Sequence, residues 1–278
     1  MTTAQLIQKS VNPDGKMIAT VEVKAPLVIW AEVLTHCMLS RNAQSNRACG
    51  VLKQLERIAQ DMFFPIWTKC TEDFKGMQGE EGSFSQEEIA ELNEKHLEIF
   101  EYMKEQVLWF KSKHVHKQNA NRYLHPFQYI TAIITATEWD NFFELRCHSA
   151  AQPEIRELAE LMRTEVLKSC SVKLNWGEWH LPYVDYDLLH RAHVSPYEAG
   201  NIPTDMAKVA SVASVARVSF NNHDGTERTY SKDEGLHKRL VKEKHASPFE
   251  HQAQAMRGRF YKLDGFCSYR YELENPRG

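Results

Sequence analysis

The sequence lacks the features that mark several classes of protein. It has six cysteines among 278 residues but no Cys-x-x-Cys pair, and no secretory leader precedes them, so a reduced compartment fits better than a disulfide framework. No apolar run approaches the roughly 20 residues that a membrane span needs. The formal net charge is -3, which provides no basic excess for a nucleic-acid backbone. These absences predict a soluble, cytoplasmic protein without a membrane or a nucleic-acid polymer as a partner.

The patterns that are present predict both strands and helices. Met17 to Lys24 alternates as a strand, and Pro26 then begins a helix at a position where its missing N–H costs little. Phe127 to Thr135 reads as a strand buried on both faces. Ser85 and Glu88 form a capping box that opens a long helix. The apolar stripe of this helix, Ile89 to Phe110, predicts a core or a subunit interface.

A polar segment, Thr35 to Arg47, lies between two helical patterns and is predicted to be a loop. Its hydroxyls, amides and guanidinium suit a phosphate and a ribose, although a plain polar turn has the same composition. These side chains are Ser40, Asn42, Ser45, Asn46 and Arg47.

A short helix is predicted after the second strand, with Thr137 as its N-cap and Asp140 three residues on. Trp139, Phe142 and Leu145 fall on one helical face. Asn141 and Arg146 project elsewhere, where they could face a planar ligand. A core helix with a merely solvated arginine explains the same spacing.

Two groups of histidines suggest a metal but do not support one. His114, His116 and His125 have irregular spacing and no carboxylate partners. His190 and His193 form an i,i+3 pair without an obvious third ligand. We therefore expect no metal site.

The C-terminal part contains a helical pattern, Met206 to Ala216, that runs into Ala-Arg-Val-Ser-Phe at 216–220. A charged helix from Lys232 to Lys244 precedes His-Ala-Ser-Pro-Phe-Glu-His at 245–251. In the tail from Arg257 to Arg270, the pair Asp264-Gly265 predicts a hairpin turn that extends the sheet.

Four separated segments resemble the flavin-dependent thymidylate synthases. Asn-Phe-Phe-x-Leu-Arg at 141–146, followed by Ala-Gln-x-Glu-Ile at 151–155, is similar to the helix that carries the family's ring-activating arginine. The loop of 35–47 matches the family at His36, Ser40, Asn42, Ser45 and Arg47. Thr35, Cys37 and Ala43 replace two arginines and a glutamate of the family loop. Val23 to Pro26 resembles its lead-in strand, and Arg122, four residues before Pro126, resembles a second phosphate-side arginine.

The motifs at 216–220 and 245–251 resemble flavin-binding motifs that family members carry near the N-terminus, so the motif order is permuted here. The resemblance implies one catalytic domain over 1–278, with the nucleotide loop and activating helix in 1–170 and a connector and flavin motifs in 171–278. It implies an α+β fold, with a central, mostly antiparallel sheet flanked by helices and a long-helix bundle region.

The implied reaction is C5-methylation of dUMP to dTMP with FAD, NADPH and methylenetetrahydrofolate. Arg146 is expected to be catalytic, without a cysteine nucleophile. The residues expected to bind substrate are Glu32, Thr35, Ala43, Gln44, Ser45, Asn46, Arg47, Arg122 and Arg146. Those expected to bind the cofactor are His36, Cys37, Thr137, Asn141, Ser219, His245, Ser247 and Glu250.

The resemblance also implies a homotetramer whose active sites are shared between subunits. Two alternatives remain for the function. The departures in the loop leave room for hydroxymethylation or for action on dCMP or UMP. The second alternative is a catalytically inactive protein that binds flavin or nucleotide. The presence of Arg47, Arg122 and Arg146 argues against it.

Overall fold

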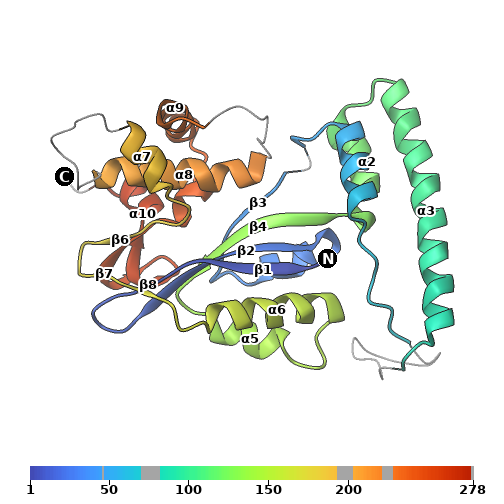
Figure 1. Cartoon of the computed structure of the whole chain (residues 1–278), viewed down its shortest axis with the longest axis horizontal. Coiled ribbons are helices and arrows are strands. Elements are labelled where there is room, and N and C mark those ends of the chain that lie inside the picture. The colour runs from blue at the N-terminus through green and yellow to red at the C-terminus, as the bar shows by residue number, and fades with distance from the viewer. Residues whose placement is uncertain (46, 70–81, 193–202, 221–227, 277–278) are drawn as a thin grey trace.

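The computed structural model describes residues 1–45, 47–69, 82–192, 203–220 and 228–276 (Figure 1). Its centre is a five-stranded sheet in the order β3-β4-β2-β1-β5, in which only the pair β1 and β5 is parallel. The strands are β1 (Thr3–Val11), β2 (Met17–Pro26), β3 (Ser40–Ala43), β4 (Tyr129–Ala136) and β5 (Val172–Lys173). With helices on both sides, the fold is α+β with a mostly antiparallel central sheet, as predicted.

One face of the sheet is apolar because β2 and β4 alternate. Ala19, Val21 and Val23 of β2 are at most 1% exposed and pack against helix α6 (Pro153–Val166). The preceding helix α5 (Asp140–Arg146) adds Phe142 to the same cluster. Replacing a fully buried leucine such as Leu158 of α6 with alanine costs about 2–5 kcal/mol in cavity-forming cores. This layer therefore holds α5 in the same core as α6 and the sheet.

The opposite face carries a chain of buried polar side chains. His180 binds Thr20 through Nε2 at 2.8 Å, Thr20 binds Thr135 at 2.7 Å, and Thr135 binds Nδ1 of His251 at 2.8 Å. Ser10 closes the other end at His180 Nδ1, at 2.8 Å. Burial lowers the pKa of His180 to about 3 and that of His251 to about 4. Both rings are therefore neutral hydrogen-bonding groups that join the central sheet to the C-terminal part.

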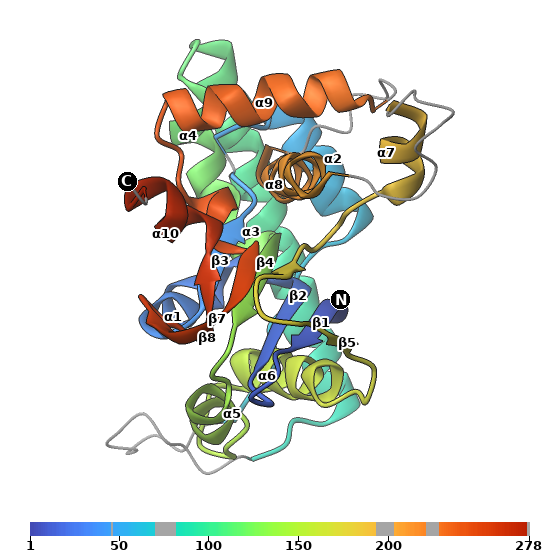
Figure 2. The ribbon, with the colours of Figure 1, turned by 90° about the vertical axis from the view of Figure 1, so that its left-hand side faces the viewer.

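A second, three-stranded sheet follows the order β6-β7-β8. Its strands are β6 (Trp179–His180), β7 (Ala253–Phe260) and β8 (Leu263–Ser268). The C-terminal helices gather around it at one end of the central sheet (Figures 1 and 2). They are α7 (Tyr186–Ala192), α8 (Thr204–Phe220), α9 (Tyr230–Lys242), η3 (Ser247–Glu250) and α10 (Tyr269–Glu274).

The hairpin of the C-terminal tail differs from the prediction in two ways. The turn between β7 and β8 lies at Tyr261, which has φ 54°, and not at Asp264-Gly265, which lies within β8. The hairpin also forms its own sheet instead of extending the central one. Gly265 has φ 77°, and a Cβ there would lie 2.5 Å from Asn12 Nδ2. The glycine therefore allows β8 to lie close to the β1–β2 turn. No local sequence pattern reveals this contact.

A helical region lies at the other end of the central sheet (Figure 1). Ser85 caps α3 with the predicted capping box, and Phe100 and Val107 of its stripe are buried against η2. Other apolar side chains of α3 are exposed, including Trp109 at 54%. The elements are α2 (Val51–Gln60), α3 (Gln86–Ser112), α4 (Lys117–Ala120) and η2 (Asn121–Phe127). Among the described residues, no helix is long and apolar enough to cross a membrane.

The segment from Thr35 to Arg47 is not entirely the predicted loop. It contains β3, which pairs with β4 from Ser40↔Thr135 to Ala43↔Ala132. Ser40 is 0% and Asn42 5% exposed, so polar side chains face the interior here. A strand of four residues with buried polar groups has no hydrophobic alternation, which is why the pattern indicated a loop.

Candidate active site

The Arg146 side chain is held where α5 ends, beside the helix that follows β2. A 3₁₀ turn, η1 (Leu27–Ile29), leads from Pro26 into α1 (Trp30–Thr35). Arg146 Nε donates to His36 Nε2 at 2.9 Å, and Nη1 lies 3.3 Å from Glu32 Oε2. Its Nη2 has no hydrogen-bond partner in the part of the chain that the structure describes, so this edge of the guanidinium is available to a ligand.

His36 is suited to accept the hydrogen bond from Arg146. Burial, and then the charges of Arg146 and Arg41, lower the pKa of His36. The ring is therefore neutral near pH 7, and its Nε2 can accept while its Nδ1 carries the proton. Phe142 packs edge-to-face against this ring at 4.9 Å between centroids. The imidazole is thus fixed by one polar and one aromatic contact.

Arg41 supports this arrangement and was not among the expected site residues. Its Nη1 donates to the carbonyls of Val33, Leu34 and His36 at 3.0, 2.9 and 3.1 Å. These carbonyls end α1, where backbone acceptors lack intrahelical partners and a cation is favourable. An arginine that follows a predicted helix end by a few residues is the sequence signal that could have identified this role.

The substrate-loop residues lie at the other end of β4. The backbone N–H of Gln44 donates to Thr131 O, and Ser45 Oγ accepts from the N–H of Arg47 at 3.3 Å. Asn121, next to Arg122, donates to Cys49 O at 3.0 Å, so the segments of Arg47 and Arg122 adjoin. Both arginine side chains are exposed. Ala43 is the last residue of β3, and the predicted residue Asn46 lies outside the described residues.

The structure therefore separates the two predicted arginine sites. Arg122 precedes β4 and Arg146 follows it, and the eight residues of β4 rise about 23 Å along the strand. Thr35 and Cys37 stay near Arg146, but Thr35 Oγ1 donates to Glu32 O and the Cys37 thiol to Thr35 O. Cys37 is exposed.

The C-terminal motif packs against β3. Ser247 Oγ donates to Asn42 Oδ1 at 3.2 Å, and Asn42 Nδ2 donates to Val215 O of α8 at 2.8 Å. Segments more than 170 residues apart in sequence thus meet at one short strand. The side chain of Ser219, further along α8, is outside the described set.

Glu250 lies beside a cavity of about 420 Å³ that Ser40 also lines. Burial alone raises the pKa of the Glu250 carboxyl, but Lys262 at 2.8 Å and Arg270 at 2.6 Å bring its pKa below the usual value. Glu274 also lines the cavity and lies 2.8 Å from Arg270 Nε, so the two cations face two carboxylates. The buried hydroxyl of Ser40 has no partner among the described residues. The cavity therefore offers hydrogen-bond donors and acceptors to a polar, oxygen-rich ligand.

The remaining predicted cofactor residues are more dispersed. Asn141 is exposed at the start of α5. Thr137 was predicted to cap this helix, and this prediction is wrong. Its Oγ1 accepts from the N–H of Asp264 at 3.0 Å, and the N-cap position falls on Trp139. Leu145 is 52% exposed and does not join the apolar face. His245 is exposed, and its Nε2 lies 3.2 Å from Glu243.

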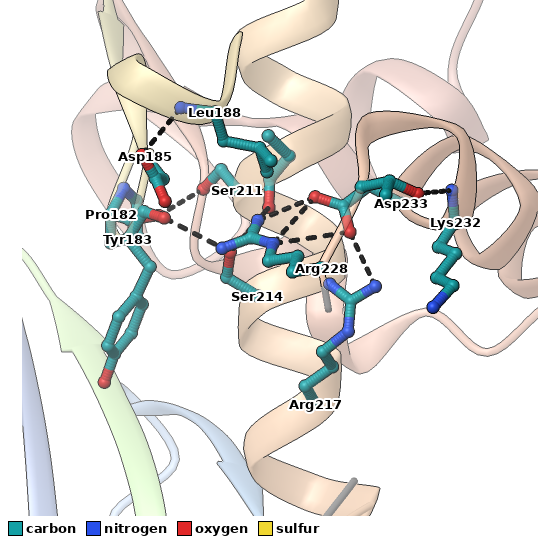
Figure 3. Close-up of polar contacts among 12 residues, drawn as sticks. Pro182, Tyr183, Asp185, Leu188, Ser211, Ser214, Arg217, Arg228, Lys232 and Asp233 are labelled. Atoms are coloured by element: carbon teal, nitrogen blue, oxygen red, sulfur yellow. Dashed lines mark hydrogen bonds and ion pairs between the residues drawn. The ribbon is translucent and has the colours of Figure 1, made fainter. Parts of the chain in front are cut away.

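Helix α8 is fixed by a buried ion cluster (Figure 3). Asp233 of α9 is 0% exposed and lies 2.6 Å from Arg217 Nη2 and 2.7 Å from Arg228 Nη2. Arg228 also donates to Ala210 O and Ser214 Oγ. The arginine of the 216–220 motif is thus tied to the neighbouring helix.

No group of three or more metal-ligating side chains occurs among the described residues. His193 of the sequence pair lies outside them.

Comparison with known proteins identifies one family. The sequence model described as "Thymidylate synthase complementing protein" matches residues 15–170. A search of curated protein sequences found no match.

Among solved structures, the chain is similar to a UMP/dUMP methylase, PolB, from Streptomyces cacaoi. The PolB structure bound with 5-Br dUMP has 17% identity, covers 59% of this chain and 89% of PolB, and has a TM-score of 0.48. The structure bound with 5-Br UMP has 16% identity, coverages of 59% and 88%, and a TM-score of 0.46.

Proposed function

Because the chain belongs to the thymidylate synthase complementing protein family, the flavin-dependent thymidylate synthases, we propose that it methylates C5 of a pyrimidine nucleoside monophosphate, converting dUMP to dTMP. Methylenetetrahydrofolate would supply the carbon, and NADPH would reduce the flavin. The observation that carries this proposal is the oriented Arg146, held by His36 at 2.9 Å and Glu32 at 3.3 Å with Nη2 left open.

Arg146 would activate the pyrimidine ring. A planar, permanently charged guanidinium can stabilise negative charge that develops at N3 and O4 without changing its own protonation state. His36 and Glu32 restrict its rotation, and Arg41 holds the helix end that carries His36. The chain thus supplies a preorganised cation, which costs little reorganisation when charge develops.

The residues at the 420 Å³ cavity fit a flavin nucleotide, FAD. Lys262 and Arg270 carry N–H donors, although both are paired with carboxylates of the cavity, and Glu250 offers a carboxylate to a ribose or ring N–H. Ser40 offers a hydroxyl without a partner among the described residues. The other residues that we propose to contact the flavin lie outside the lining of this cavity; they are His36, Cys37, Thr137, Asn141, Ser219, His245 and Ser247. When bound, the flavin supplies the hydride chemistry that the side chains cannot perform.

The substrate phosphate would bind Arg47 and Arg122, with Ser45. Both side chains are exposed, and their chain segments are joined by the hydrogen bond from Asn121 to Cys49 O. Since they lie at the end of β4 opposite Arg146, one mononucleotide does not reach both sets in one chain. We therefore propose a homotetramer in which the phosphate end of one chain faces the Arg146 end of another. Closed symmetry repeats such a pairing at every site.

The permuted motif order is part of this proposal. Its support is that Asn42 of β3 contacts both Ser247, within one C-terminal motif, and Val215, next to the other. A permuted chain keeps such contacts when the joined ends of the ancestral fold lay close together.

The decisive experiment mixes the purified protein with FAD, NADPH and methylenetetrahydrofolate and offers dUMP, dCMP and UMP separately. We expect dTMP from dUMP, identified by product mass, and flavin absorbance retained after gel filtration. A hydroxymethyl product would correct the proposed reaction, and a preference for dCMP or UMP would correct the proposed substrate. Thr35, Cys37 and Ala43, which replace residues of the family loop, are the reason to test both. Flavin binding without any product would identify the protein as an inactive binding homologue.

A further inference from the structure

The β7–β8 hairpin contacts the entrance of the helix that carries Arg146. The N–H of Asp264 donates to Thr137 Oγ1 at 3.0 Å. Arg259 Nη1 donates to Glu138 Oε2 at 3.3 Å. Both acceptors lie between the end of β4 and the start of α5, so one hairpin holds the chain where it enters this helix. The family match covers residues 15–170 and does not include the hairpin.

The same hairpin also contacts the turn that carries His36. Lys262, in the turn between β7 and β8, donates from Nζ to Leu39 O at 3.3 Å, and Figure 2 shows the hairpin beside β3. Leu39 is the last residue before β3, and its N–H donates to His36 O at 3.1 Å, so residues 36–39 form one tight turn. Lys262 thus binds the end of the turn whose first residue accepts from Arg146.

Lys262 has a second acceptor, the carboxylate of Glu250 at 2.8 Å. The Lys262 side chain is 26% exposed and that of Glu250 is 13% exposed, so water screens this pair only in part. Glu250 does not depend on Lys262 alone, because Arg270 also lies 2.6 Å from its carboxylate. Removing the Lys262 ammonium would therefore leave Glu250 paired, and its specific effect would fall on Leu39 O.

The position from which Lys262 reaches both acceptors is itself held in place. Tyr261, the residue before it, has φ 54°, a region that bulky residues rarely adopt. Such a conformation persists only where the surroundings determine it. The Tyr261 hydroxyl donates to Glu274 Oε2 at 3.0 Å, and its ring packs edge-to-face on Tyr271 at 4.8 Å between centroids. Helix α10 thus holds the hairpin turn, which gives the lysine a fixed support.

We propose that Lys262 is a positioning residue for Arg146. It ties the turn of residues 36–39 to Glu250 and thereby fixes the imidazole of His36, which restricts the rotation of the guanidinium. Such a support matters, because a misplacement of about 1 Å can cost about 10²-fold in rate. That Arg146 is the group to be positioned rests on the proposed function, whereas the contacts of Lys262 do not.

The titration of His36 reports how this turn is held. The titratable and charged groups near its ring come from several elements; they are Arg146 of α5, Arg41 of β3, Glu32 of α1, the neighbouring Cys37 and, behind the turn, Lys262 and Glu250. Burial, and then the charges of Arg146 and Arg41, lower the pKa of His36. If the turn loosens, water reaches the ring and the guanidinium moves away. Both causes then weaken, and the pKa rises towards the ordinary value of about 6.5.

The test measures histidine C2–H exchange across a range of pH, by mass spectrometry of peptides from the full chain as purified. In Lys262→Met the midpoint for His36 should move up towards about 6.5, and turnover of dUMP should fall by up to about 10²-fold. Lys262→Arg keeps a charged donor and should retain the wild-type midpoint. Lys16→Met is the matched control and should also leave it unchanged. Lys16 pairs with Asp264 of the same hairpin at 2.6 Å but makes neither contact of Lys262 in the described part of the chain.

An unchanged His36 midpoint in Lys262→Met would overturn the proposal. An equal shift in Lys16→Met would also overturn it, because the effect would then come from the charge or stability of the hairpin. If circular dichroism shows that Lys262→Met does not fold, Lys262→Gln takes its place with the same expectation. If no dTMP forms but the His36 midpoint still depends on Lys262, the proposed function fails and this inference stands. If dTMP forms while the midpoint does not depend on Lys262, this inference alone fails.

Discussion

The two ends of β4 differ in how completely one chain builds them. At the end beside α5, Arg146 is only 24% exposed and already has two side-chain partners, Glu32 and His36. At the other end, Arg47 and Arg122 are exposed and form no ion pair with the described residues. Ring activation requires a fixed direction of charge, whereas phosphate binding tolerates side chains that settle on the ligand. The first end is therefore preorganised within one chain, whereas the exposed arginines of the second are free to settle on the phosphate and on the second chain that we propose for it.

The largest effect is expected at the preorganised end. Arg146→Lys keeps the charge but loses the planar fork and the Nε donor to His36. Turnover of dUMP should fall by about 10²–10³-fold, as for the loss of one preorganised donor, while flavin affinity stays near that of wild type. Steady-state rates and flavin titration measure both. Product formation near the wild-type rate would show that Arg146 has another role.

A mixed oligomer tests whether the two ends meet between chains. Arg47→Ala and Arg146→Ala should each be inactive, because each removes one half of every site. Co-expressed with different tags and purified for both, they should regain part of the activity, since some interfaces then combine two intact halves. If proven mixed oligomers stay inactive, or if light scattering shows a monomer, both arginines act within one chain.

The contact between His36 and Arg146 predicts a pH effect of intermediate size. Burial and two guanidiniums lower the pKa of His36, so its neutral, accepting form persists as the pH falls through the ordinary histidine value of about 6.5. Activity should therefore decline only below that pH, when a protonated ring can no longer accept from Arg146 Nε. His36→Asn, whose side-chain carbonyl also accepts, should lack this decline.

Unfolding must be measured at the same pH values. His180 and His251 also have lowered pKa values, about 3 and about 4. The unfolded chain binds their protons first, so the stability they contribute is complete above about pH 6.5 and is lost as the pH falls towards those values. Circular dichroism separates this loss from the decline that depends on His36. If the activity of His36→Asn declines with the same midpoint pH as that of wild type, the decline is caused by unfolding and not by His36.

Local sequence patterns predicted single strands and helix caps better than they predicted contacts between distant segments. The strand at 17–24 and the capping box at Ser85 depend on local periodicity or capping, and both occur as predicted. The strand predicted at 127–135 occurs as β4, from Tyr129 to Ala136. β3 was missed because its buried residues are polar. The hairpin turn was placed wrongly because Gly265 allows the close approach of the Asn12 side chain, 253 residues away in sequence, and does not form a turn. Arg41 was missed because its partners are backbone carbonyls, so only its position a few residues after a predicted helix end could have indicated its role.

Cys37 is expected to give the smallest effect and tests the departure from the family loop. Its thiol is exposed and contacts only the carbonyl of Thr35, at 3.6 Å, which is a weak hydrogen bond. Cys37→Ala should therefore keep most of the activity and the same melting temperature, because it removes little buried surface. Cys37→Arg restores the residue type of the family loop and adds positive charge near Arg146, where a flavin phosphate would benefit from it. We expect tighter flavin binding in this variant, measured by fluorescence titration, with Cys37→Lys as the control for charge alone. Complete loss of turnover in Cys37→Ala, at unchanged stability and flavin content, would mean that the thiol takes part in the reaction.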